Sequence, residues 1–121
     1  MANQARQLDQ LFKALSDVTR RAIVMQLCAG EASVGELAKP FEMALPSLMK
    51  HIRILETSGL VSSAKHGRVR TCSVQTEALA TLEVWLAAHR ETWESRLDRL
   101  DSYVAKLKEE DQPDAHRRPS R

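Results

Sequence analysis

The residues of this chain best suited to chemistry are cations that gather between positions 46 and 70. Glu56 is the only acidic residue in that stretch, although the whole chain carries a net charge of just +2. Guanidinium and ammonium groups donate charge-assisted hydrogen bonds to phosphate oxygens and neutralise their charge. Such a concentration predicts contact with the backbone and base edges of double-stranded DNA. The residues expected to make that contact are Pro46, Ser47, Lys50, His51, Arg53, Lys65, Arg68 and Arg70.

Each of these residues also has a plainer interpretation. The lysines and arginines could form an ordinary solvated surface, and Ser47 could be a simple first-turn helix residue. Pro46 can serve only to start a helix, because its ring presets a helical φ angle. For His51, contact with DNA and a structural hydrogen bond inside the protein are both open.

Other reactive residue types form no catalytic pattern. The sequence has no glycine-rich phosphate loop, no GxSxG and no HExxH motif, so we expect neither an enzyme nor a cofactor. The two cysteines match no zinc or disulfide spacing, which favours a reducing compartment. We expect Cys28, on an apolar helix stripe, to be buried. Cys72, on a strand, could be partly exposed and act as a thiol switch.

A helix-turn-helix at 33–58 is the pair of elements that would position the cations. Ser33 and Glu36 fit a capping box at the start of its short first helix. Pro46 is well placed as the first residue of the second helix, expected at 45–58. Apolar residues at helical spacing predict the buried face of that helix. They are Leu48, Ile52 and Leu55.

Further elements are expected on both sides of the helix-turn-helix. Apolar spacing predicts helices at 4–15 and 18–29, with the Ser-Asp pair between them supplying a cap. Residues 60–74 contain two strand-like runs that turn at or beside Gly67, which predicts a hairpin wing.

The last predicted element is a long helix at 77–109, with Thr76 as its cap. At ~1.5 Å per residue it would be about 50 Å long, so we expect a second copy of the chain to cover its apolar seam. Trp85 and Trp93 could instead line a pocket for an inducer. The expected dimer interface combines this helix with the one at 4–15. Its residues are Leu8, Leu11, Phe12, Leu86, His89, Trp93, Leu97, Leu100 and Val104.

Length and composition fit one domain at 1–110. Its expected class is mainly α (α+β): a winged helix-turn-helix with about five helices, a two-stranded β-hairpin wing and a long C-terminal dimerisation helix. Residues 111–121 contain two prolines and no large apolar side chain, so we expect a disordered tail. The absence of a signal peptide and of a long apolar run predicts a cytoplasmic protein without a membrane partner.

Several short sequence motifs lie, one after another, on these predicted elements. They read FKALSDVTRR at 12–21, GELA at 35–38, KHIRILE at 50–56, GLV at 59–61 and GR at 67–68. Over roughly 8–107 the chain therefore resembles the ArsR/SmtB family of bacterial winged-helix repressors. The resemblance implies a symmetric dimer, joined through its first and last helices, on a palindromic operator. It also implies repression without ligand and release of DNA by an inducer.

The chain departs from the family pattern at two places. Val18 replaces the commoner proline at a helix start. In the family that the chain resembles, metal-sensing members carry a cysteine pair in the first helix of the helix-turn-helix, or carboxylate and histidine ligands on the last helix. Here residues 34–39 read VGELAK, and the last helix offers only His89 and scattered glutamates. Because zinc and similar metals need several converging ligands, we expect no metal site.

Together these features predict a homodimeric repressor of transcription. We expect the helix at 45–58 to enter the major groove and the hairpin at 60–74 to contact the flanking backbone. A small-molecule inducer is possible, and its identity is unknown. Two alternatives stay open: a winged-helix module that binds proteins and no longer binds DNA, and a DNA-binding sensor that responds to thiol chemistry or metal.

Overall fold

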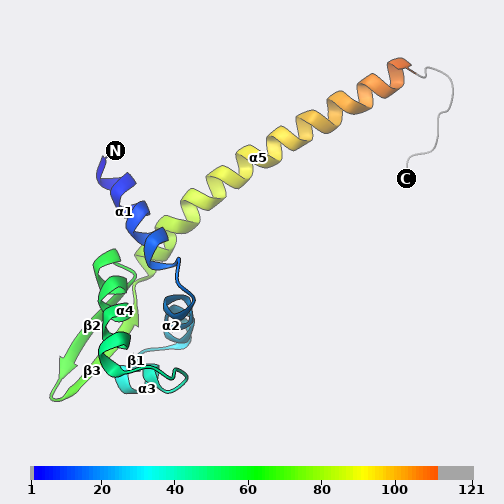
Figure 1. Cartoon of the computed structure of the whole chain (residues 1–121). Helices are drawn as coiled ribbons and strands as arrows, with labels where there is room; N and C mark the ends of the chain where they lie inside the picture. Colours follow the sequence, from blue (N-terminus) through cyan, green and yellow to red (C-terminus); the bar gives the residue numbers. More distant parts are fainter. Residues whose placement is uncertain (1, 112–121) are drawn as a thin grey trace. The chain divides into compact units, whose positions relative to one another are not determined.

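The helices and strands follow the predicted order, with one additional strand. The computed structural model describes residues 2–111, with side chains from residue 5 onwards. The elements are α1 (Ala2–Ala14), α2 (Val18–Ala29), β1 (Ala32–Ser33), α3 (Val34–Ala38), α4 (Leu45–Ser58), β2 (Val61–His66), β3 (Val69–Val74) and α5 (Thr76–Asp111) (Figure 1). The chain divides into two compact units, 1–83 and 84–121. The tail predicted at 111–121 lies outside the described residues, except for Asp111, which ends α5.

The first unit contains the winged helix-turn-helix with its own apolar core. α1 packs against α4, and α4 in turn packs against β2 (Figure 1). The predicted inner face of α4 is confirmed, because Leu48, Ile52 and Leu55 are all buried. The other buried apolar residues are Leu11, Ala14, Ile23, Val24, Leu27, Leu37, Leu60, Val61, Cys72, Ala78 and Leu82. This core fixes which side of α4 remains exposed.

The hairpin is part of a three-stranded antiparallel sheet in the order β1-β3-β2. Residues 61–66 pair with 69–74 around Gly67, as predicted. β1 was not predicted, because its two residues are too few to show the alternation typical of a strand. Ala32 pairs with Cys72 and Ser33 with Thr71. β3 is therefore the central strand and not an edge.

Capping residues define the starts of α2 and α3 and the end of α4. Asp17 caps α2 by accepting the backbone N–H of Arg20 at 3.1 Å. Ser33 and Glu36 form the predicted capping box of α3, since each side chain accepts the other residue's backbone N–H, at 3.1 and 2.8 Å. Gly59 ends α4 in the left-handed conformation, with φ of 90°. The caps of α3 and α4 therefore fix where the first helix of the helix-turn-helix begins and where its second helix ends.

The bounds predicted for α4, 45–58, are confirmed, but the residue roles predicted at the starts of α4 and α5 are each displaced by one position. α4 begins at Leu45 after Ala44, so Pro46 is its second residue and not its first. α5 begins at Thr76, and the carbonyl of Gln75 accepts the N–H groups of Ala78 and Leu79. Gln75, and not Thr76, therefore occupies the cap position.

The environments predicted for the two thiols were reversed. Cys28 is exposed and Cys72 is fully buried. Cys28 follows Val24 by four residues, which places it about 40° further round the helix, outside the buried stripe of α2. Cys72 is buried because its side chain belongs to the apolar core, where α2 and α3 contact β3.

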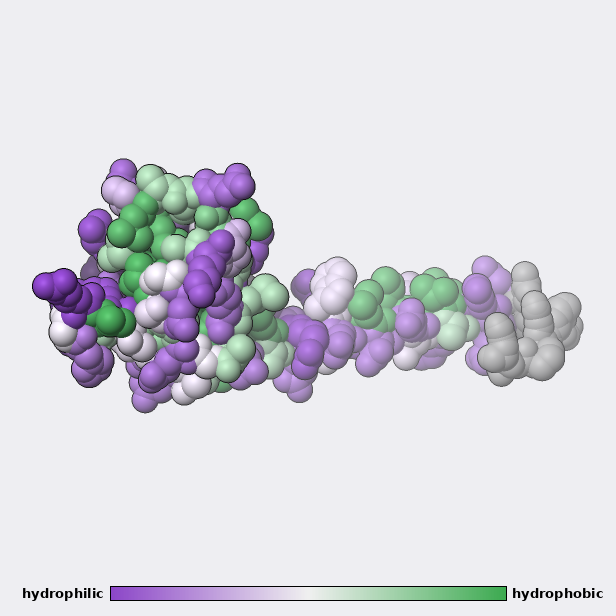
Figure 2. All heavy atoms as spheres, turned by 90° about the horizontal axis from the view of Figure 1, so that it is seen from below, coloured by the Kyte–Doolittle hydropathy of each residue, from purple (hydrophilic) through white to green (hydrophobic). Residues whose placement is uncertain are grey.

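The second unit contains the described residues 84–111, which form the larger part of α5. Every side chain in this segment is exposed in the single chain, and apolar side chains gather on its surface (Figure 2). None of the helices in the described part of the chain has the length and apolar character needed to cross a membrane.

Candidate nucleic-acid interface

The outer face of α4 carries exposed polar and cationic side chains. Ser47, Lys50 and Arg53 are exposed, each turned away from the core side of the helix. Pro46 is also exposed, and Ile54 is 37% exposed. Because the helix repeats every 3.6 residues, these positions form one stripe along α4. Such a stripe offers hydrogen-bond donors and positive charge to an anionic partner.

The wing adds a second group of cations. Lys65, His66 and Arg68 are exposed on or beside the turn that joins β2 and β3. Gly67 has φ of 65° in that turn, a backbone conformation that glycine adopts without steric cost. The exposed tip is therefore short and positively charged.

Glu56, the acidic residue of this region, already has a partner inside the protein. Its Oε2 accepts a hydrogen bond from the hydroxyl of Ser63 on β2. Arg70 on β3 donates to the same hydroxyl oxygen from Nη1 at 2.9 Å. Arg70 is half-buried, unlike Arg68 at the tip. The predicted contact residue Arg70 is thus engaged with the protein itself.

His51 lies on the side of α4 that meets α2, and it is half-buried. Its Nδ1 is 3.1 Å from Nη1 of Arg20 and 3.8 Å from Oδ2 of Asp17. Since arginine can only donate, Nδ1 of His51 is the acceptor in the first contact. These contacts favour the structural interpretation of His51, while its contact with DNA stays a prediction.

Arg20 connects three helices, a role that the sequence reading missed. Its Nε donates to the carbonyl of Ala14 at 2.7 Å, and its Nη2 donates to the carbonyl of Lys13 at 3.2 Å. Both carbonyls belong to the last turn of α1, where helix carbonyls lack partners within the helix. The only sequence signal was the TRR triplet after the Asp17 cap, which does not reveal how far the side chain reaches.

One carboxyl group and one thiol group near the candidate interface have shifted pKa values. The pKa of Asp17 is lowered, chiefly because its carboxylate accepts the backbone N–H of Arg20. The pKa of the Cys72 thiol is raised, first by burial and then by the negative charge of Glu56. The charge of Arg70 opposes that rise.

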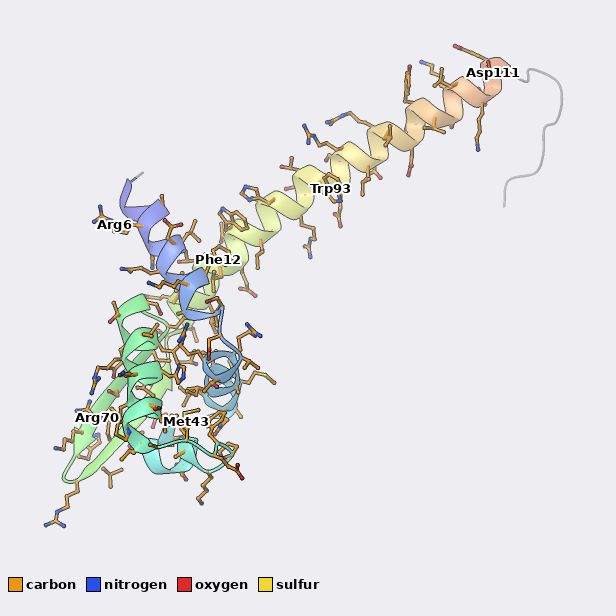
Figure 3. The ribbon with its side chains drawn as sticks, in the orientation of Figure 1. Arg6, Phe12, Met43, Arg70, Trp93 and Asp111 are labelled. Carbon is orange, nitrogen blue, oxygen red and sulfur yellow. The ribbon has the colours of Figure 1, made fainter. Side chains whose placement is uncertain are left out.

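The residues predicted for a dimer interface fall into two environments. Leu11 is fully buried in the core of its own chain, so its assignment to an interface was wrong. Leu8 is half-buried and Phe12 is 39% exposed. The α5 members are all exposed, among them Trp93 (Figure 3). They are Leu86, His89, Trp93, Leu97, Leu100 and Val104.

His89 has local partners within α5. Its ring stacks on that of Trp85 with the centroids 4.1 Å apart, and its Nδ1 donates to the carbonyl of Trp85 at 2.8 Å. Within residues 2–111, no group of three or more His, Cys, Asp or Glu side chains is arranged to hold a metal ion.

Comparisons with known proteins agree on one family. Residues 17–63 match the sequence profile of the bacterial regulatory protein, arsR family. The chain is 38% identical to the HTH-type transcriptional regulator Rv2034 of Mycobacterium tuberculosis over 74 residues, which cover 61% of this chain and 69% of the relative. It is 32% identical to the transcriptional repressor SdpR of Bacillus subtilis over 79 residues, which cover 65% and 88%. The crystal structure of the ArsR family transcriptional regulator RHA00566 matches with 54% identity and a TM-score of 0.72, covering 75% of this chain and 94% of that one.

Proposed function

The chain belongs to the ArsR family of bacterial regulatory proteins, which are transcriptional regulators and not enzymes. On this premise we propose that it is a homodimer that binds a palindromic operator and represses transcription. One relative, SdpR, is itself named a transcriptional repressor. In this proposal α4 enters the major groove and the wing contacts the flanking phosphates. Two-fold symmetry would then place the two half-sites about one DNA turn, ~34 Å, apart.

The exposed stripe of α4 is the observation that carries this proposal. Lys50 and Arg53 stand exposed on it, while Glu56 is bonded to Ser63. The face is therefore cationic, with no acidic side chain directed outwards between positions 46 and 58. Such a face attracts phosphates through counterion release and can donate to base edges.

The experiment that tests the proposal removes two charges from this face. Lys50→Ala plus Arg53→Ala should weaken operator binding by about a hundredfold or more, since each lost contact costs about 1–3 kcal/mol. The slope of log affinity against log salt should fall by about two. Titration of labelled operator duplex at several salt concentrations measures both quantities. The operator is first obtained by selecting bound fragments of genomic DNA.

A matched control separates local contact from net charge. Arg99→Ala plus Lys106→Ala removes the same charge from exposed positions of α5 and should leave operator affinity unchanged. Equal loss in both double variants would show that net charge, and not the α4 face, drives binding. A wild-type protein that binds no duplex even in dilute salt would instead leave the protein-interaction alternative.

In this proposal, the repressor does not sense a metal at either of the two positions that metal-sensing members use. Residues 34–39 lack cysteine, and His89 is already bonded to Trp85. The burial of Cys72 also weighs against the thiol alternative at that residue. A small-molecule inducer would therefore need a site of a different kind.

A further inference from the structure

Three side chains link the wing to α4. Ser63 on β2 donates its hydroxyl proton to Glu56 on α4 and accepts a hydrogen bond from Arg70 on β3 at 2.9 Å. The strand register explains the second contact. Ser63 stands opposite Cys72 and Lys65 opposite Arg70, so all four side chains share one face of the hairpin. Arg70 therefore reaches diagonally to Ser63 on the same face of the sheet as the buried Cys72.

The two charged groups that bond to Ser63 are opposite in sign and lie in a partly buried site. Glu56 and Arg70 are both half-buried, and their charges act in opposite directions on the pKa of Cys72. A hydrogen bond to a charged group in such a site is stronger than a neutral one. Removing one partner lowers stability, because the other partner is left partly buried without a hydrogen bond. Arg68, two residues earlier on the turn, is exposed and makes no hydrogen bond to the part of the protein that the structure describes.

The outer half of the wing needs an additional attachment. β1 pairs only with Thr71 and Cys72, so residues 64–70 form a hairpin of two strands without a third. A two-stranded hairpin is at best marginally stable in water by itself. Arg70, at the end of this half, is connected through Ser63 to Glu56 on α4, and this connection would limit how far the tip can move.

We propose that Glu56, Ser63 and Arg70 form a clamp that fixes the wing on α4, and that Arg70 is a positioning residue and not a phosphate contact. The clamp rests on the proposed function only in its consequence for DNA. It sets the distance between the cations of α4 and those of the wing tip, so that both reach the same duplex. The clamp itself is a property of the free protein.

Hydrogen exchange of the free protein tests the clamp without DNA. In Arg70→Ala and in Ser63→Ala the amides of 64–70 should exchange about tenfold faster or more, because the first variant removes one charge-assisted hydrogen bond of the clamp and the second removes both. Arg68→Ala is the matched control and should leave their exchange unchanged. Ser63→Ala alters no charge, so it keeps the test decisive if Arg70→Ala does not fold. Unchanged exchange in both clamp variants would overturn the proposal.

Salt titration of operator binding then separates positioning from contact. Arg68→Ala should lower the slope of log affinity against log salt by about one. Ser63→Ala and Arg70→Ala should weaken binding about five- to tenfold while keeping the wild-type slope. A slope lowered by Arg70→Ala as much as by Arg68→Ala would make Arg70 a phosphate contact and refute its positioning role. If the wild-type protein binds no duplex, the proposed function fails, and the exchange result still decides the clamp.

Discussion

The two thiols of the chain differ in what a reagent can reach. Cys28 is exposed in the last turn of α2, whereas Cys72 is 0% exposed on the central strand of the sheet. Burial raises the pKa of the Cys72 thiol, and the neighbouring charge of Glu56 raises it further. Because the thiolate is the reactive form, both access and protonation protect Cys72.

We therefore expect selective alkylation of Cys28 in the folded protein at neutral pH. Iodoacetamide followed by peptide mass spectrometry should label Cys28 and leave Cys72 unmodified until denaturant is added. In Cys28→Ser the native protein should take up no label, and the unfolded protein should take up one. Labelling of Cys72 at the rate of Cys28 under native conditions would contradict the burial described here.

At the residue scale the sequence reveals the type of a side chain more readily than its partner. The cationic character of the 46–70 stretch was predictable, and the exposed positions of Lys50, Arg53 and Arg68 are consistent with it. The engagement of Arg70 with Ser63 was not predictable, because it depends on the strand register and on the approach of α4. His51 likewise shows its contact with Arg20 only once α2 and α4 are packed.

Among the elements, α4 depends on how it ends. Gly59 has φ of 90°, and its N–H donates to the carbonyl of Glu56. A methyl group on Gly59 would meet no atom within 4 Å, so any cost of a larger residue comes from the backbone conformation alone. Gly35, within α3, has no such conformation, and a methyl group there would lie 3.8 Å from Oγ of Ser33, an ordinary contact.

These two glycines predict stability changes of opposite sign. Gly59→Ala should lower the free energy of unfolding by about 1–2 kcal/mol, because alanine is strained at positive φ. Gly35→Ala should raise it by about 0.5 kcal/mol, since alanine loses less backbone entropy in a helix. Denaturant titrations at one fixed protein concentration compare the variants with wild type, because the proposed dimer would make stability depend on concentration. A stabilising Gly59→Ala would contradict the left-handed end of α4.

Elements with a clear period and a cap were predictable, and very short ones were not. α2 and α4 combine apolar repeats with a cap or a terminal glycine, so their bounds came directly from the residues. β1 has only two residues, and one of them, Ser33, is also the cap of α3. Its presence follows from pairing with β3, a contact far away in the sequence.

At the scale of the whole molecule, the second unit has no core of its own. All described side chains of 84–111 are exposed in the single chain, including Leu97 at 42% and Leu100 at 56%. Apolar residues recur there at alternating steps of three and four, the spacing of a helix that packs on another helix. They are Trp93, Leu97, Leu100, Val104 and Leu107. A second copy of the chain is the occupant that the proposed function supplies for this seam.

Charges placed in that seam should separate the two copies. Leu97→Glu plus Leu100→Glu should halve the mass measured by light scattering at micromolar concentration, because four carboxylates would have to be buried in each dimer. Residues 1–83 should keep their fold, since neither leucine belongs to the core. Operator affinity should fall by about a hundredfold or more, because a monomer loses the gain from binding two linked half-sites. Ser95→Glu plus Ser102→Glu adds the same charge on the opposite side of α5 and should leave the dimer intact. A dimer that persists in the leucine variant would show that a surface other than this seam joins the two copies.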